Sequence, residues 1–304
     1  MAQNETRRAV NGIILVNKPK DLTSNAVLQR AKRLLNAKKA GHTGSLDPLA
    51  TGMLPICFGE ATKFCQYLLD ADKCYQVVGR LGIKTNTSDS TGEMIAQVEN
   101  FSVSTQSLQT VLAQFTGEIQ QIPSMFSALK HNGMPLYHFA RAGVEIERAA
   151  RPVKIHALNL EYFDGEFIHL TVRCSKGTYI RNLIEDIGDQ LEVGAHVTQL
   201  HRVFTAGFEG EQMFTLEELA EQVQNSPSMD TCLLSMERAV DYLPQVYLDE
   251  LSVIALQRGQ KLQLEPTAIH GLVRLYDAHQ QFIGLAEQSA LGDVRVKRLL
   301  QYSN

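Results

Sequence analysis

The sequence contains no long hydrophobic run. No uninterrupted apolar stretch among its 304 residues approaches the length of about eighteen that marks a membrane-spanning helix. The N-terminal residues MAQNETRRAVNG also lack the apolar centre of a secretory signal. We therefore expect no membrane association and a cytoplasmic location.

Cysteine is scarce and irregularly spaced. The five cysteines are an odd number without a C-x-x-C pair, which argues against a disulfide framework and against a structural zinc site. The histidines outside the motif discussed below show no zinc-like spacing. We expect reduced, mostly buried thiols and no bound metal.

The chain also lacks a positive net charge, which stands at −4. The charges are unevenly distributed, because residues 1–42 hold nine Lys or Arg against two acids, whereas residues 209–241 hold eight acids against one Arg. A phosphate backbone responds to local potential, so the basic N-terminal segment could bind RNA. A solvated helix face is the commoner cause of such a run and remains the alternative.

The sequence is rich in strand and helix patterns. Its 44% hydrophobic and 20% charged residues are typical of a globular protein with one large core and a second small one. Strand patterns occur at 13–16, 75–81, 153–163 and 167–174, and helical spacing at 25–35, 61–69, 107–115 and 179–191. Thr23 and Ser24 offer an N-cap to the first helix. The polar run 85–92 indicates a surface loop.

The order of these patterns predicts an α+β fold. The segments 153–163 and 167–174 flank a turn at Asp164-Gly165 as in a hairpin, which favours a mixed, largely antiparallel sheet flanked by helices. From about Leu248, several short alternating segments predict a small β module. We expect two domains, residues 1–247 and 248–304.

The first segment with chemical potential is the run from Gly41 to Pro48, Gly-His-Thr-Gly-Ser-Leu-Asp-Pro. Asp47 precedes Pro48, which biases it away from helical backbone and toward an exposed turn. A carboxylate there could act as nucleophile, base or metal ligand. On local features alone, an Asx-type turn residue is the commoner explanation.

Two further segments carry candidate side chains. Tyr75 opens a predicted strand, where an aromatic residue is most often part of the core. Arg181 lies in the first turn of a predicted helix, where the dipole disfavours a cation, so its position calls for a carboxylate or phosphate partner. An exposed surface Arg is the alternative.

Together, collinear segments along nearly the whole chain resemble the bacterial tRNA pseudouridine-55 synthases, the TruB family. The matching segments are Asn11-Gly12 to Lys18-Pro19, 41–59, 61–64, Leu81-Gly82, Thr85, 87–89, 121–130, 175–181 and 194–197. The resemblance implies a pseudouridine synthase fold with a PUA-like RNA-binding module at the C-terminus. It also implies conversion of the T-loop uridine of tRNA to pseudouridine, without a cofactor, a guide RNA or an obligatory protein partner.

The same resemblance assigns roles to individual residues. Asp47 matches the catalytic aspartate, which attacks the anomeric carbon of the ribose or stabilises the positive charge formed there. Arg181 matches its arginine partner, which we expect to keep the pKa of Asp47 low. Tyr75 matches the active-site tyrosine, which stacks on the uracil and is a candidate base.

Four more positions match substrate-binding or supporting residues of the family. Tyr179 and Leu200 correspond to residues that line the pocket, and Lys18 to the lysine that supports the active-site loop. His42 corresponds to the histidine that enters the space left by the flipped base, since the target must leave the RNA stack before its sugar can be reached.

The sequence departs from the family pattern beside the chemistry. Asn17 stands where the family is commonly acidic, Asp21 where Gly is usual, and His201 where an Arg often follows the pocket leucine. Three other functions are alternatives: a non-catalytic RNA-binding protein, a synthase guided by a separate RNA, and a metal-dependent hydrolase that uses Asp47. The combination of Asp47, Tyr75 and Arg181 and the absence of suitably spaced metal ligands argue against the first and the third. The short, self-contained layout argues against the second.

Overall fold

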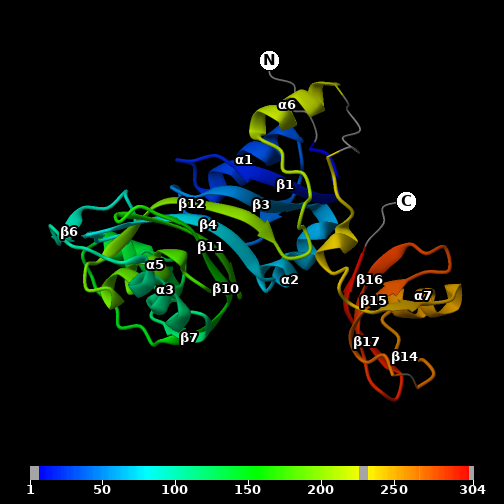
Figure 1. Ribbon diagram of the computed structural model, residues 1–304. Helices are drawn as coiled ribbons and strands as arrows, with labels where there is room; N and C mark the ends of the chain where they lie inside the picture. The colour runs from blue at the N-terminus through cyan, green and yellow to red at the C-terminus, as the bar shows by residue number, and fades with distance from the viewer. Residues whose placement is uncertain (1–6, 226–231, 267, 301–304) are drawn as a thin grey trace.

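A single curved sheet organises the larger part of the chain in the computed structural model, which describes residues 7–225, 232–266 and 268–300 (Figure 1). Its strand order is β1-β3-β12-β4-β11-β10-β7, with β2 also paired to β3. The strands are β1 (Gly12–Lys18), β2 (Ala40–His42), β3 (Thr51–Phe58), β4 (Lys73–Leu81), β7 (Gly117–Gln121), β10 (Arg151–Phe163), β11 (Phe167–Cys174) and β12 (Ala195–Thr205). The expected mixed, largely antiparallel sheet is confirmed.

The parallel contact in this sheet joins β3 to β12 at its centre, whereas the neighbouring pairs run antiparallel. Gly52 of β3 lies opposite Arg202 of β12 with φ of 97°. A Cβ at Gly52 would lie 2.2 Å from the Arg202 carbonyl oxygen, so only glycine allows the two strands to approach here. This approach brings the chain around residues 44–52 next to β12.

Helices cover the sheet on both halves. Helices α1 (Ser24–Leu34) and α6 (Leu216–Asn225) pack over β1 and β3, while α3 (Thr105–Gln114) and α5 (Ile180–Gln190) pack over β4, β10 and β11. The hydroxyl of Thr23 accepts a hydrogen bond from Ala26 N at 3.1 Å, so the predicted N-cap is confirmed. Across the described ranges, no helix has both the length and the apolar character to cross a membrane.

The predicted helix at 61–69 is two short elements. Residues Gly59–Phe64 form the 3₁₀ helix η1, and α2 (Cys65–Leu69) follows it. The remaining short elements are β5 (Ile83–Thr85), β6 (Met94–Gln97), β8 (Lys130–His131), β9 (Met134–Pro135), α4 (Leu136–Arg141) and η2 (Met236–Ala239). The correction is one of geometry, since the apolar positions Ala61, Phe64 and Leu68 are buried as a helical face requires.

The prediction that residues 85–92 form a surface loop is wrong for part of this segment. Thr85, Ser88 and Asp89 are buried. The carboxylate of Asp89 accepts hydrogen bonds from Thr91 N at 2.9 Å and from the Thr87 hydroxyl at 2.9 Å, and Ser90 N donates to Val197 O of β12. A polar sequence folds inward here because its polar groups satisfy one another.

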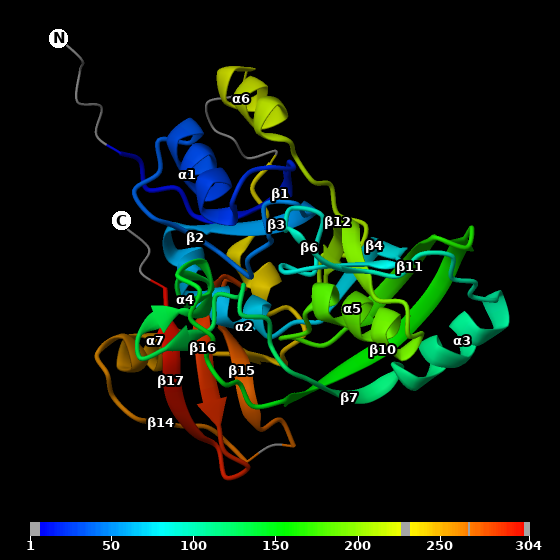
Figure 2. The same cartoon turned by 90° about the vertical axis from the view of Figure 1, so that its left-hand side faces the viewer.

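The C-terminal residues form the expected small β module, seen beside the main body in Figure 2. Its sheet has the order β13-β15-β16-β17-β14. The elements are β13 (Gln245–Tyr247), α7 (Glu250–Gln257), β14 (Leu262–Gln263), β15 (Gly271–Tyr276), β16 (Phe282–Gln288) and β17 (Asp293–Leu299). Phe282 packs on Phe64 with ring centroids 5.5 Å apart, and Lys63 Nζ donates to Leu299 O at 2.8 Å, so the module is fixed to η1.

Candidate active site

The loop between β2 and β3 carries Asp47 at the centre of the sheet. Ser24, at the start of α1, holds this loop: its hydroxyl accepts from Leu46 N at 2.7 Å and lies 3.0 Å from Leu46 O. Asp21 N also donates to Pro48 O at 2.8 Å. The backbone on both sides of Asp47 is therefore fixed before any ligand binds.

Arg181 pairs with Asp47. Arg181 lies in the first turn of α5, and its Nε is 2.8 Å from Asp47 Oδ2. Its Nη1 donates to Thr87 O at 2.8 Å and its Nη2 to Phe126 O at 2.9 Å. The sequence predicted a carboxylate or phosphate partner for Arg181, and Asp47 is that partner. The same guanidinium contacts three segments that lie far apart in the sequence.

A second carboxylate lies behind the same guanidinium. Asp89 Oδ2 is 3.8 Å from Arg181 Nη1, and both side chains are 6% exposed, whereas the side chain of Asp47 is 40% exposed. Asp89 is therefore the buried counter-ion, and Asp47 is the carboxylate that faces the open side. Sequence reasoning assigned Asp89 no role, because it lies in a polar stretch that predicted a surface loop.

The ionisation of Asp47 corrects an expectation from the sequence. Burial raises the pKa of this carboxyl above its usual value, Arg181 opposes the rise, and the negative charge of Asp89 adds to it. The net direction is upward, whereas the resemblance led us to expect that Arg181 keeps the pKa low. The arginine offsets only part of the cost of burying the carboxylate beside another acid.

Asp47 lines a cavity of about 390 Å³. Tyr75 on β4, Leu200 on β12, and Tyr179 and Arg181 at the start of α5 line it together with Asp47. Burial raises the pKa of the Tyr75 and Tyr179 phenols, which favours their neutral forms. Five predicted site residues therefore share one cavity with an aromatic, an aliphatic and a charged wall.

Arg202 forms the floor of this cavity and was missed by the sequence analysis. It lies opposite Tyr75 in the β12–β4 register and is 1% exposed. Its Nε donates to Met53 O at 2.6 Å and its Nη2 donates to Gly44 O at 3.2 Å. Burial raises the pKa of the Tyr75 phenol, and the positive charge of the adjacent Arg202 opposes that rise. An Arg in a strand pattern gives no sign of such burial, although its place two residues after Leu200 puts it on the same strand face.

Lys18 and His42 lie next to the cavity rather than among the residues that line it. Lys18 is fully buried and its Nζ donates to Pro19 O at 2.8 Å and Pro48 O at 3.3 Å, so it holds the loop. Burial lowers the pKa of Lys18 to about 8. His42 ends β2, and burial together with nearby Arg202 lowers its pKa, so neutral imidazole predominates at pH 7.

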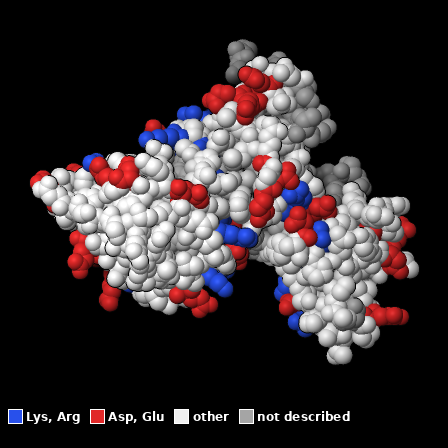
Figure 3. Space-filling model, in the orientation of Figure 1, with Lys and Arg blue, Asp and Glu red and all other residues white. Residues whose placement is uncertain are grey.

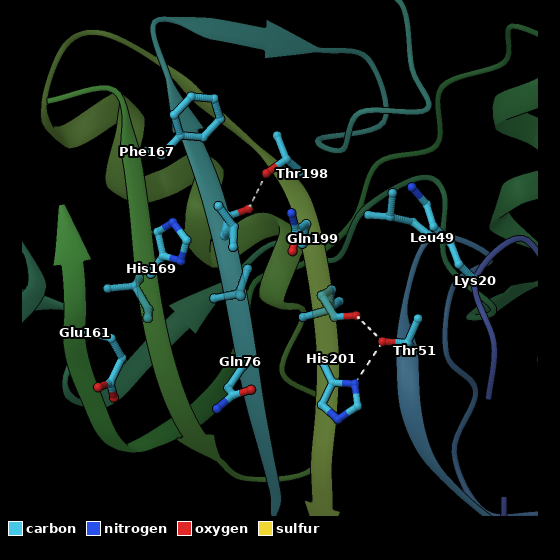
Figure 4. A pocket seen from close by; sticks show the side chains of 14 residues that line it. Lys20, Leu49, Thr51, Gln76, Glu161, Phe167, His169, Thr198, Gln199 and His201 are labelled. Carbon is cyan, nitrogen blue, oxygen red and sulfur yellow. Dashed lines mark hydrogen bonds between the residues drawn. The ribbon is translucent and has the colours of Figure 1, made fainter. Parts of the chain in front are cut away.

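A second, larger cavity of about 750 Å³ lies over the opposite face of the sheet (Figure 4). Gln76 and Gln199 project into it from β4 and β12, where alternation turns them away from Tyr75. Two histidines, His169 and His201, line it. Nδ1 of His201 lies 2.9 Å from the Thr51 hydroxyl, and burial lowers the pKa of His201. His201 therefore contacts β3 on the far side of the sheet from Asp47.

The surface charge follows the asymmetry seen in the sequence. Figure 3 shows acidic side chains gathered over α6 and basic side chains beside them in the region of α1. Arg30, Arg33, Lys38 and Lys39 are exposed, whereas Lys18 is buried and adds nothing to that surface. Within the described ranges, no cluster of three or more potential metal ligands occurs.

Comparisons with known proteins agree along the whole chain. The TruB family pseudouridylate synthase N-terminal domain matches residues 32–180, and two TruB C-terminal domains match residues 181–241 and 244–300. A protein of Legionella pneumophila named tRNA pseudouridine synthase B is 55% identical over 306 residues, covering all of both chains.

The chain belongs to the TruB family.

A second relative with the same name, from Aeromonas salmonicida, is 50% identical over 97% of this chain and 95% of its own. Among solved structures, a Cbf5-Nop10-Gar1 complex contains a chain with a TM-score of 0.74 and 27% identity, covering 95% of this chain and 84% of that one. As a member of the TruB family, the chain is an isomerase with the pseudouridine synthase fold, and its function is that of the tRNA pseudouridine synthase B group.

Proposed function

We propose that this enzyme converts the uridine at position 55, in the T-loop of tRNA, to pseudouridine, with Asp47 as nucleophile. The observation that carries the proposal is the Asp47–Arg181 pair of 2.8 Å at the mouth of the cavity. The reaction breaks a glycosidic bond, so it requires a carboxylate that can attack the anomeric carbon or stabilise the positive charge on the ribose. Asp47 is the cavity carboxylate with an exposed side chain.

The remaining cavity residues fit the requirements of a detached base. Tyr75 offers an aromatic face on which the uracil can stack. Its phenol lies next to Arg202, and we propose that it takes a proton from the substrate during the rearrangement. Tyr179 and Leu200 close the sides of a space of about 390 Å³, which suits a single nucleoside.

Access to that space requires base flipping. A uridine inside a folded loop must leave the stack at a cost of a few kcal/mol before its sugar can reach Asp47. His42 lies at the start of the same loop, and we propose that its neutral imidazole takes the place of the extruded base. Lys18 supports this loop from below through Pro48 O.

We further propose that residues 1–247 act as the catalytic domain and residues 248–304 as a PUA-like RNA-binding module. Strand β13 pairs with β15, so the folded module takes in residues from 245 onward. The Cbf5 relatives are named as parts of complexes, whereas we propose that this chain acts without a guide RNA or protein partner, in the cytoplasm.

The test uses purified protein and a T-arm stem-loop whose target uridine carries tritium at carbon 5. Forming the new carbon–carbon bond releases that hydrogen, so tritium in water measures conversion. We expect conversion without added metal or nucleotide, and its abolition in Asp47→Ala with RNA binding nearly intact. Full activity of Asp47→Ala would refute the nucleophile assignment. A second stem-loop labelled only at its other uridines tests the target, and tritium release from it without release from the first would refute the proposed position.

A further inference from the structure

Two thiols meet behind the catalytic loop. Gly41 of β2 pairs directly with Cys57 of β3, so the Cys57 side chain lies on the face where Gly41 has no side chain. Cys65, at the start of α2, fills this space: its Sγ lies 3.9 Å from Gly41 O, and a Cβ on Gly41 would lie 3.6 Å from that sulfur. Cys65 also packs against the hydrophobic cluster that contains Cys57.

The two cysteines differ in the way that a redox pair requires. Cys57 is fully buried, whereas Cys65 is partly exposed. The neighbouring Cys57 thiol, against the opposing effect of burial and with help from Lys39, lowers the pKa of Cys65, while the pKa of Cys57 lies well above its usual value. Cys65 is thus the more acidic and the more accessible thiol of the two, and Cys57 is the one that stays protonated.

We infer that Cys57 and Cys65 are a modification site, a dithiol that peroxide oxidises reversibly to a disulfide. The Cys65 thiolate attacks one peroxide oxygen, forming a sulfenic acid and releasing hydroxide. The Cys57 sulfur then attacks the Cys65 sulfur, the S–O bond breaks, and the oxygen leaves as water with the thiol proton. The two sulfurs lose two electrons and the peroxide gains them.

The site is coupled to the catalytic loop by position. A disulfide requires the sulfurs to come within about 2.05 Å, and Cys57 is held in the packed centre of β3, so Cys65 makes the movement. Oxidation also removes the Cys65 proton that is donated to Gly41 O, one residue before His42. The oxidised enzyme is therefore less active, an inference that rests on the proposed role of this loop.

The other cysteines provide an internal comparison. Burial raises the pKa of Cys174 to about 12, which leaves it inert toward oxidants. Cys232 is buried in the core beneath α1 and α6. Cys232→Ser therefore serves as the matched control, because it removes one thiol without touching the pair.

The first experiment measures the modification itself and does not depend on the proposed reaction. The full chain, freed of reductant, is treated with hydrogen peroxide and analysed by intact mass and non-reducing peptide mapping. We expect a loss of about 2 Da and a linked Cys57–Cys65 peptide, both reversed by dithiothreitol. The product should persist in Cys232→Ser and vanish in Cys65→Ser. Oxygen addition at Cys65 without the linked peptide, or linkage to another cysteine, would overturn the inference.

The second experiment measures the coupling. Each protein is compared with its own reduced form in the tritium-release assay. Because a shift of about 1 Å in a catalytic loop can cost up to about 100-fold in rate, we expect wild-type activity to fall about tenfold or more on oxidation and to return with dithiothreitol. Cys65→Ser should keep its activity under peroxide. An unchanged rate in the fully disulfide-linked wild type would overturn the coupling while leaving the modification site intact.

Discussion

The two sides of the cavity hold buried arginines in opposite ways. Arg181 binds two carboxylates, Asp47 and Asp89, in addition to backbone carbonyls. Arg202 is even less exposed, yet its side-chain hydrogen bonds go to the carbonyls of Met53 and Gly44, and Tyr75 lies opposite it in the sheet. The first arginine neutralises charge, whereas the second joins strands and adds positive potential beneath the cavity.

This difference separates stability from chemistry. A buried ion pair contributes little net stability when intact but becomes costly when one member is removed, because the other charge stays buried. A guanidinium bound to carbonyls leaves only neutral acceptors behind, each of which costs about 1–3 kcal/mol when buried and unsatisfied. The comparison therefore predicts unequal outcomes for the same substitution on the two sides.

The largest effect is expected for Arg181→Met. It leaves Asp89 buried without its cation, which should lower the free energy of unfolding by about 3–5 kcal/mol beyond the cost of Thr87 O and Phe126 O, which it also leaves unsatisfied. It also removes the partner that orients Asp47, and we expect kcat to fall about 100-fold or more. Urea titration and tritium release measure the two effects. Arg181→Lys is the control, which should recover most stability but little activity, because an ammonium cannot reproduce the fork.

Some of this site was accessible from the sequence and some was not. The dipole argument at Arg181 and the proline after Asp47 each indicated an unusual residue, but local features alone favoured a turn for Asp47 and left an exposed surface Arg open for Arg181. Collinear resemblance reversed that preference. The sequence analysis missed Arg202 because a charged residue in a strand is usually exposed. It missed Asp89 because a run of Thr, Ser, Asp and Gly is usually a surface loop.

The fold shows the same division. Where local periodicity indicated a strand or a helix, the element mostly lies within a few residues of its predicted bounds. Strands β3 and β12 of the main sheet were not predicted. The insertion of β12 between β3 and β4, with its parallel contact at Gly52, depends on pairing between residues about 150 positions apart. No local pattern encodes that pairing, because it is decided by which apolar faces can be buried together.

The second prediction concerns the residue that joins the two sides. Tyr75→Phe keeps the aromatic ring and removes the hydroxyl of the residue that lies opposite Arg202 in the sheet. We expect an almost unchanged KM, because stacking remains, and a fall in kcat of about 100-fold, because the candidate base is gone. Tyr75→Leu should raise KM as well. Equal kinetics of Tyr75→Phe and wild type would restrict the tyrosine to stacking.

The third prediction is Arg202→Met, the counterpart of Arg181→Met. It leaves the carbonyls of Met53 and Gly44 unsatisfied, so at about 1–3 kcal/mol for each we expect the free energy of unfolding to fall by about 2–6 kcal/mol. The loss should be smaller than in Arg181→Met, which also leaves two carbonyls unsatisfied and in addition removes the cation from a buried carboxylate. Parallel urea titrations of the two variants measure the difference directly. A loss at Arg202 equal to or larger than that at Arg181 would break the comparison, since it would mean that carbonyls hold a buried cation as tightly as carboxylates do.

The smallest effect is a shift in pH dependence caused by Asp89→Asn. Burial raises the pKa of Asp47, Arg181 lowers it, and the Asp89 charge raises it further. Asparagine keeps an oxygen that can accept from Thr91 N but removes that charge. The proposed reaction requires Asp47 as a carboxylate, so activity should be lost as the pH falls through its pKa in the folded enzyme, and a lower pKa should move that loss to more acidic pH.

We therefore expect the acid limb of the kcat/KM profile to move to lower pH in Asp89→Asn, with a much smaller change on the plateau above that limb. The matched control is Asp186→Asn on α5, because burial and the neighbours Glu185 and Asp189 raise the pKa of Asp186 to about 6 and it lies within a separate acidic group. Its acid limb should coincide with that of the wild type. An Asp89→Asn profile that coincides with the wild type, or moves to higher pH, would show that Asp89 holds Arg181 in place without acting on the charge of Asp47, and the Arg181 side of the cavity would then resemble the Arg202 side.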